Sequence, residues 1–447
     1  MRKALFGLLS GSLISALSIN GFASIFAHGP HQTLGHVAQS QQLSSVALNP
    51  ASGWLVLDRD ESMRFSYLSS FGLAFEYGNA ENFTEELDEL ADLLDEDNIT
   101  LDQADDTLDR FNKVIASLAE EGYFRGTGDL PIPALPAVFK MPGTPGNVVV
   151  DADSMLLFKG SVLSAPFSTT GSCQDLICLV DDERYETKTS LYIKGAELLR
   201  LSVGYSQPVR EMWTNKSYQG SVIMGGRLNI FRLGLSKQVI TIDSIEDDDI
   251  SDVIVDDYVD NQEITTEFGL DVGVIYLADR FQIGLTIANI NEPEFEFGAV
   301  GVDCTEKETS SMNNCFAALD FVNQGQIDSQ EVYTMSAVST LEGSVRLIAG
   351  WQVSASMDLG EYNDPVGDEV QWMSFSTAYY TTIPMMPDFR AGYRKNLAGE
   401  ELSTVNFGLT LGGVFNADFN VGLEKTEVDG SSYPRQFGFS LGFEKSF

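Results

Sequence analysis

The chain has few side chains from which an active site could be built. Its only histidines, His28, His31 and His36, all lie near the N-terminus. No Gly-x-Ser-x-Gly motif or metal-binding helix motif accompanies them, so a Ser-His-Asp arrangement would have to take its base from this N-terminal part. Carboxylates are so abundant that a pair of them is no signature of glycosidase chemistry. We therefore expect neither an enzyme nor a resident cofactor.

The four cysteines form two locally spaced pairs, Cys173 with Cys178 and Cys304 with Cys315. In an oxidising compartment, this spacing favours two disulfides that each close a small loop. A zinc site is the weaker interpretation, because all the histidines lie far from these cysteines in the sequence.

The charge of the chain excludes nucleic acid as a partner. With 65 acidic and 27 basic residues, the formal net charge is -38, so the positive potential that attracts phosphates is absent. The acidic run from Asp243 to Asp260 could hold Ca²⁺, or bridge to lipopolysaccharide phosphates through divalent cations. It lacks the residue spacing of a calcium-binding loop, so a solvated acidic loop is the favoured interpretation.

The N-terminus has the three parts of a secretory signal. Arg2 and Lys3 precede an apolar run that ends at Ile19, and small residues precede a cleavage site after Ala23. We predict a signal peptide over 1–23; an N-terminal membrane anchor is disfavoured because the run is short for a span. No other stretch approaches the ~18 consecutive apolar residues of a transmembrane helix, so we expect either a secreted soluble protein or a transmembrane β-barrel.

From residue 187 onward, apolar residues alternate with small or polar ones in segments of about ten residues, which predicts strands with one apolar face. The pattern has Phe268, Leu270, Val272, Val274 and Tyr276 opposite Glu267, Gly269, Asp271 and Gly273; Phe231, Leu233 and Leu235 opposite Arg232, Gly234 and Ser236; and Val405, Phe407, Leu409 and Leu411 opposite Asn406, Gly408, Thr410 and Gly412. In a barrel the apolar face meets lipid, which makes Asp271 and Arg232 lumen candidates that could pair with each other. A soluble sandwich would alternate in the same way.

The connections between these segments favour the barrel, because they run alternately short and long, as tight periplasmic turns and large outer loops require. Leu277 to Arg280, Glu342 to Ser344 and Pro384 to Pro387 are short, whereas the connection with Cys304 and Cys315 is long. We predict an all-β, transmembrane antiparallel barrel over 63–447 with about fourteen strands. They lie near 63–78, 152–166, 187–206, 218–228, 230–241, 264–277, 281–290, 331–341, 345–358, 370–381, 388–396, 402–412, 416–426 and 435–447. Segment 167–186 breaks the alternation, so either that turn is unusually long or the early strands are miscounted.

The last predicted strand places Phe437, Phe439, Leu441, Phe443 and the terminal Phe447 on one face. A C-terminal amphipathic strand that ends in Phe resembles the signal by which the barrel-assembly machinery inserts outer-membrane barrels. Lys445 departs from that pattern, because it interrupts the apolar face where the pattern usually has an aromatic or aliphatic residue.

Residues 81–121 are acidic, but apolar residues recur in them at helical spacing. They predict two amphipathic helices, broken near Asp97, within an acidic helical insertion over 80–146 that lies outside the membrane. The apolar stripe would pack the two helices together, which is the favoured use, or cap the barrel mouth or dock a partner.

Short phrases in the chain are similar to those of a known family. They are Val46-Ala47-Leu48-Asn49-Pro50-Ala51-Ser52-Gly53 after the signal, Leu201 to Tyr205, Phe268 to Tyr276, and Asn289 to Pro293. Together with the final Phe, they resemble the FadL-type superfamily of long-chain fatty-acid transporters, and within it the barrels labelled conjugal-transfer TraF. The resemblance implies a fourteen-stranded barrel with an N-terminal hatch, here 24–62, in which Asn49, Pro50 and Ala51 make a turn inside the lumen. It identifies no ligand site.

Three functions are compatible with these features. The first is a passive outer-membrane channel for hydrophobic or small solutes, in contact with lipid and lipopolysaccharide. The second is an assembly component of a cell-envelope system such as a conjugal-transfer apparatus, and the third is a secreted soluble β-protein. The barrel is favoured over the soluble protein, and the channel over the assembly component.

Overall fold

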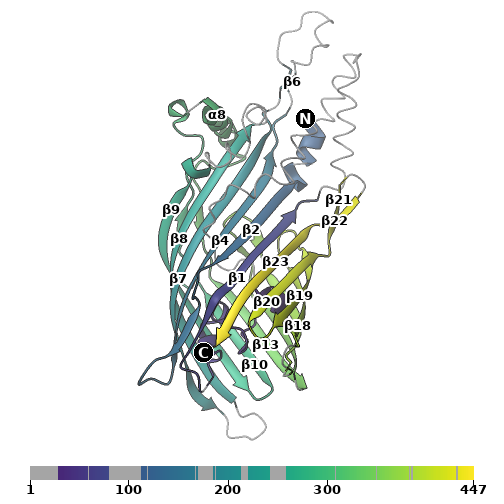
Figure 1. The fold of residues 1–447 in the computed structure, drawn as a ribbon. Helices are drawn as coiled ribbons and strands as arrows, with labels where there is room; N and C mark the ends of the chain where they lie inside the picture. Colours follow the sequence, from purple (N-terminus) through teal and green to yellow (C-terminus); the bar gives the residue numbers. More distant parts are fainter. Residues whose placement is uncertain are drawn as a thin grey trace, which may run out of the picture.

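The computed structural model is a β-barrel with long strands that tilt around its axis (Figure 1). The structure describes residues 29–58, 60–79, 112–117, 119–166, 168–169, 185–186, 188–212, 220–241, 258–307, 309–348, 350–381, 383, 386–428 and 431–446. The predicted signal peptide, most of the stretch 81–121 predicted to hold two helices, most of the acidic run from Asp243, and Cys173, Cys178 and Phe447 lie outside these residues.

One closed antiparallel sheet forms the barrel. In chain order its strands are β1 (Met63–Tyr77), β2 (Tyr123–Pro131), β3 (Ala137–Lys140), β4 (Asn147–Leu163), β7 (Ser190–Met212), β8 (Gly220–Thr241), β9 (Glu263–Ala278), β10 (Phe281–Ala288), β13 (Val338–Ile348), β14 (Trp351–Asp358), β17 (Trp372–Tyr379), β18 (Asp388–Asn396), β19 (Ser403–Leu411), β20 (Phe415–Gly422) and β23 (Gln436–Ser446). Both β2 and β3 pair with β1 on one side and with β4 on the other. They therefore count as one strand of the wall, and the barrel is fourteen-stranded. Pairing of β1 with β23 closes it and leaves no sheet edge.

The predicted number of strands is confirmed, but two errors in the prediction cancel. The strand made by β2 and β3 was assigned to the helical insertion over 80–146, although residues 119–121 end the helical part and β2 begins at Tyr123. Conversely, the two segments predicted at 218–228 and 230–241 form one strand, β8.

The predicted alternation of short and long connections holds with one exception, because 397–402, which lies at the loop end, is no longer than the short connections. One end, the turn end, has the short connections 141–146, 213–219, 279–280, 349–350, 380–387 and 412–414. The other, the loop end, has 78–122, 164–189, 242–262, 289–337, 359–371, 397–402 and 423–435. Segment 167–186 falls at the loop end once β2 and β3 are counted. The turn predicted at Glu342 to Ser344 is wrong, because β13 runs through these residues.

Alternation along the strands places apolar side chains on the outer face, as predicted for β9 and β19. Phe268, Leu270 and Val272 are exposed while Asp271 is buried. The assignment for β8 is wrong: Phe231, Leu233 and Leu235 are buried and face inward, whereas Arg232 is exposed. The apolar positions of β8 change phase after Ile230, which is exposed like Met224 and Leu228. A phase change at this point makes one strand look like two.

Small elements cover the loop end. They are the hairpins β5 (Ser168–Thr169) with β6 (Tyr185–Glu186), β11 (Glu294–Glu296) with β12 (Val332–Thr334), β15 (Tyr362–Asn363) with β16 (Glu369–Val370) and β21 (Lys425–Val428) with β22 (Ser431–Pro434), and the helices η5 (Cys304–Glu306) and α8 (Thr309–Asn323). Figure 1 shows α8 and the β21–β22 hairpin at this end, with the C-terminal end of β23 at the other. None of the helices in the described ranges is both long and apolar enough to cross a membrane.

Candidate functional site

Residues 29–57, here called the N-terminal segment, lie inside the barrel. The segment has three short helices, α2 (Pro30–Leu34), α3 (Ser45–Leu48) and η2 (Pro50–Trp54), and most of its residues are buried. Hydrogen bonds join it to β1, β4, β8, β10, β13, β14, β17, β20 and β23. Contacts with strands around the whole circumference mean that the segment fills the lumen toward the turn end.

Asn49 and Pro50, which the family resemblance places in a turn, stand at the start of η2. The Asn49 carboxamide oxygen accepts a hydrogen bond from the Ala51 N–H (2.9 Å) and so caps η2, while Pro50 takes the first helical position, where no N–H is needed. Two inward glycines of the wall leave room for this turn. A Cβ at Gly273 would lie 2.0 Å from Asn49 Oδ1, and one at Gly225 would lie 2.3 Å from Pro50 O.

Buried carboxylates of the wall hold the segment through its donors. Glu342 accepts from the Ala38 N–H and, at 2.6 Å, from the Asn49 side-chain amide. Glu444 accepts from the Leu43 N–H at 2.9 Å. Each contact satisfies a buried donor of the segment with a buried acceptor of the wall, and leaving such a donor unbonded is costly, so these contacts fix the position of the segment.

A second set of contacts comes from arginines that also pair with wall carboxylates. Arg227 forms an ion pair with Asp271 (2.7 Å) and donates to the carbonyls of Val46 and Ala47, both at 2.8 Å. Asp271, one of the two lumen candidates, is therefore buried, and its ion-pair partner is Arg227. Arg232 lies on the outer face of the same strand, because it is five positions from Arg227 and alternate residues face opposite ways.

His31 is buried between the segment and the wall. Its Nε2 lies 3.4 Å from Ser45 Oγ. Burial, with His36 and the Arg390 and Arg394 guanidinium groups nearby, lowers the pKa of His31 to about 3. The docked segment therefore holds a neutral imidazole at neutral pH.

Toward the loop end the inner wall becomes apolar. Its side chains come from β4, β7 and β8, and they are Met155, Leu157, Ala196, Leu198, Phe231, Leu233 and Leu235. Residues that follow β10 and β14 cover this wall: Phe295 lies against Phe231 with ring centroids 6.5 Å apart, and Phe297 and Val366 join the same cluster. The lumen thus has a polar half that holds the N-terminal segment and a half with an apolar wall.

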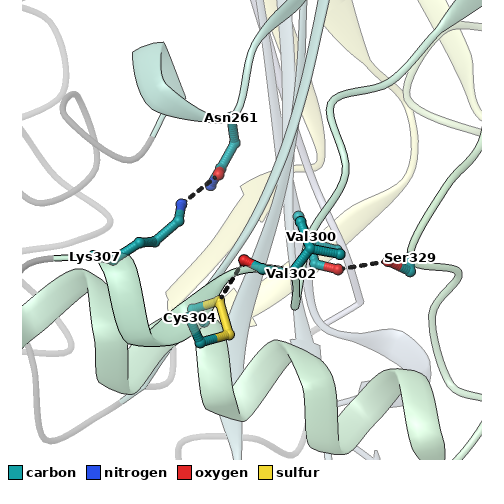
Figure 2. The surroundings of a disulfide bond; sticks show 7 residues. Asn261, Val300, Val302, Cys304, Lys307 and Ser329 are labelled. Atoms are coloured by element: carbon teal, nitrogen blue, oxygen red, sulfur yellow. Dashed lines mark hydrogen bonds between the residues drawn. A yellow bond between two sulfur atoms is a disulfide. The ribbon is translucent and has the colours of Figure 1, made fainter.

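A disulfide joins Cys304 and Cys315, as predicted for this pair, and secures α8 at the loop end. Figure 2 shows its surroundings, in which Lys307 donates to the Asn261 side chain (2.9 Å) and Ser329 donates to the Val300 carbonyl (2.7 Å). One face of α8 packs on the barrel through Ala317, Ala318 and Phe321. Among the residues that the structure describes, no group of three or more His, Cys, Asp or Glu side chains could hold a metal ion.

The lumen-facing residues Glu342, Glu444, Arg227, Arg390 and Asp418 were missed by the sequence reasoning. The available signal was a charged residue at an inward position of an alternating strand, which singled out Asp271 and, because the phase of β8 was misassigned, Arg232. Glu342 was misread as part of a turn. The predicted insertion-signal residues Phe439, Leu441 and Phe443 lie on one face of β23, and Phe443 is 43% exposed on the outside of the barrel.

Comparisons with known proteins agree with the predicted resemblance. The family model described as "F plasmid transfer operon, TraF, protein" matches residues 46–358. The chain has no match among the curated proteins.

Three similar solved structures each have about the length of this chain. The Pseudomonas putida toluene transporter TodX is 12% identical, with 96% of this chain and 99% of that chain covered and a TM-score of 0.40. The CymD monoaromatic hydrocarbon channel (10% identical, TM-score 0.47) and a Pseudomonas aeruginosa FadL homologue (10%, 0.43) have the same coverage of 96% and 99%.

Proposed function

The chain belongs to the family described as the F plasmid transfer operon TraF protein, and from this premise and the lumen described above we propose that it is a passive outer-membrane channel for hydrophobic or small solutes. The N-terminal segment is the closed gate of this channel. The barrel meets lipid and lipopolysaccharide on its outer face, and the barrel-assembly machinery inserts it by way of β23. The chain acts as a conduit and not as an enzyme.

The main support for a hydrophobic solute is the apolar inner wall of β4, β7 and β8. The interior of a membrane barrel is ordinarily polar, because it is in contact with water. Here Leu157, Leu198 and Leu233 face inward and are covered by aromatic side chains of the loops. Such a wall favours an apolar occupant, and a solute that displaced Phe295 and Phe297 would replace their contacts with its own.

The belt of exposed apolar side chains on the outer face supports the membrane location. It includes Leu201 and Val203 on β7, Leu270 and Val272 on β9, and Phe407 on β19, each 45% exposed or more. In water such a belt would drive association, whereas in a bilayer it meets hydrocarbon. A fractionated outer membrane should contain the chain, and its band on a detergent gel should migrate faster unboiled than boiled.

Uptake of the neutral dye N-phenyl-1-naphthylamine by intact cells tests the channel. Lipopolysaccharide excludes this dye, and it fluoresces once it reaches an apolar phase. Cells that express the chain should take it up faster than cells without it. The pair of substitutions Leu198→Asn and Leu233→Asn, at residues that are opposite each other on β7 and β8, should remove the gain. Ser202→Ala, in the polar half of β7, should keep it.

The family description also suggests the alternative, a component of a conjugal-transfer apparatus. A closed scaffold predicts no dye uptake by the intact chain, and none after residues 29–57 are deleted. A channel predicts uptake by both, with faster and less selective uptake after the deletion. Equal fluorescence of all these strains and of cells without the chain would refute the channel.

A further inference from the structure

Two arginines four positions apart on β18 face the lumen and differ in their surroundings. Arg390 and Arg394 are 3% and 4% exposed. Arg390 is fully engaged: it pairs with Asp418 at 2.8 Å and donates to the Leu409 carbonyl at 3.1 Å. Between them, Gly392 touches the N-terminal segment, since a Cβ there would lie 2.0 Å from Thr33 O. Arg394 therefore lies next to the docked segment, on its loop-end side.

Arg394 lacks the partners that Arg390 has. Its guanidinium stacks on the Trp372 ring, 4.4 Å from the centroid. Within the described ranges, no hydrogen bond reaches its buried Nε and Nη2 atoms, and no carboxylate lies within 4.0 Å of it as in an ion pair. The buried Asp358 carboxylate attracts Arg394 from beyond the 4.0 Å of an ion pair, so it offsets the charge only in part. Two unbonded donors on a buried cation are costly, so a ligand of opposite charge that reached them would be bound strongly here.

Arg394 lines a cavity of about 30 Å³ whose other polar groups can complete a site. Thr404, Asn406 and Asn420 contribute a hydroxyl and two amides that can donate. Gln436 also lines the cavity, but its buried Oε1 only accepts hydrogen bonds and gives an anion no contact. The carboxylate of Glu76 also borders the cavity, but it accepts from the Tyr123 hydroxyl and the Gln436 amide, both at 2.6 Å. Since one water needs roughly 10–15 Å³ by this kind of measure, the cavity has room for a group about the size of a carboxylate.

We propose that this cavity is a binding site for a small monovalent anion, with Arg394 as its principal ligand. Guanidinium has five donors and no acceptor, and its planar fork matches two oxygens of a carboxylate. The anion would be the carboxylate of a short organic acid or a chloride ion. The site lies on the lumen wall formed by β1, β2, β17, β18, β19, β20 and β23. Binding at equilibrium does not depend on whether any solute passes through the barrel.

Thermal unfolding of the detergent-solubilised barrel tests the site, with boiled and unboiled gel mobility as the measure of folding. Sodium acetate and sodium chloride are compared at equal ionic strength with sodium 2-(N-morpholino)ethanesulfonate, whose anion is too large for the cavity. Acetate, chloride or both should raise the unfolding midpoint of the natural chain, because a ligand that binds only the folded state stabilises it. A shift with acetate alone assigns a carboxylate site, and a shift with both assigns a site for small anions in general.

Arg394→Met should lower the affinity for the anion at least tenfold. Arg232→Met, which removes an exposed guanidinium from the outer face, should leave it unchanged. Without acetate or chloride, Arg394→Met should unfold at the same temperature as the natural chain or higher, because it removes an unpaired buried charge. The proposal fails if neither anion shifts the natural chain, or if the shift survives in Arg394→Met. Calorimetric titration of the natural chain with acetate and chloride decides the question even if Arg394→Met does not fold, since no binding of either anion overturns it.

Discussion

Glu342→Gln should release the N-terminal segment from the wall while the barrel stays intact. In the structure two donors, the Ala38 N–H and the Asn49 amide, meet the two oxygens of one buried carboxylate. A glutamine of the same size offers one oxygen, and its own amide would face one of the two donors. The substitution thus removes one hydrogen bond and leaves a buried donor unpaired, which costs about 1.5–3 kcal/mol. Docking should weaken by roughly 10- to 150-fold, because 1.4 kcal/mol is a factor of ten.

Hydrogen exchange measured by mass spectrometry is the direct assay. Peptides that cover residues 36–50 should exchange roughly 10- to 150-fold faster in Glu342→Gln, provided that exchange occurs through opening of the segment. Peptides from β9 and β19 should exchange as before, and the unboiled band should keep its mobility. Glu361→Gln, at an exposed position of the loop end, is the control. Unchanged exchange over 36–50, or faster exchange of the whole barrel, would refute the reasoning that Glu342 holds the segment rather than the wall.

Three further outcomes are expected. In Gly273→Ala the new Cβ would lie 2.0 Å from Asn49 Oδ1, so exchange of the segment should accelerate at a cost of about 1–3 kcal/mol, whereas Gly226→Ala, with its nearest neighbour at 3.8 Å, should have no effect. The pKa of His31 is about 3 when docked and 6.5 when released, so the released form binds the extra proton and the stabilisation present above pH 6.5 is lost as the pH falls. The contribution of His31 to docking should be smaller at pH 5 than at pH 8 by about 2 kcal/mol, measured as the difference between the pH responses of the natural chain and His31→Gln in the same exchange experiment. Replacing Cys304 by Ser opens a loop with a sequence separation of 11, which should cost about 3 kcal/mol; proteolysis should then cut near α8 while the gel mobility of the barrel is unchanged.

The strand alternation, the parity of the connections and the apolar face of the last strand could be predicted from the sequence. These features are local: residues two apart share a face whatever the rest of the chain does, and a barrel in lipid needs an apolar outside. For the same reason the alternation of β9 indicated that Asp271 faces inward, whereas the turn at Asn49 and Pro50 was implied only by the family resemblance. The segment 123–140 was missed because its charged residues and prolines follow a helical stretch, and two short strands separated by 132–136 show little alternation.

Only the tertiary structure decided which residues meet inside the barrel. Ala38 and Glu342 are 304 positions apart, and Thr33 and Asp418 are 385 apart. Their contact depends on closure of the sheet and on the path of the N-terminal segment, and neither leaves a periodic signal in the sequence. Only the fold likewise shows which side chains of β8 face inward beyond Ile230. An apolar stripe is removed from water equally well by lipid outside the barrel or by the aromatic rings of Phe295 and Phe297 inside it. The unpaired Arg394 is likewise visible only in the fold, since its sequence environment does not distinguish it from the fully paired Arg390.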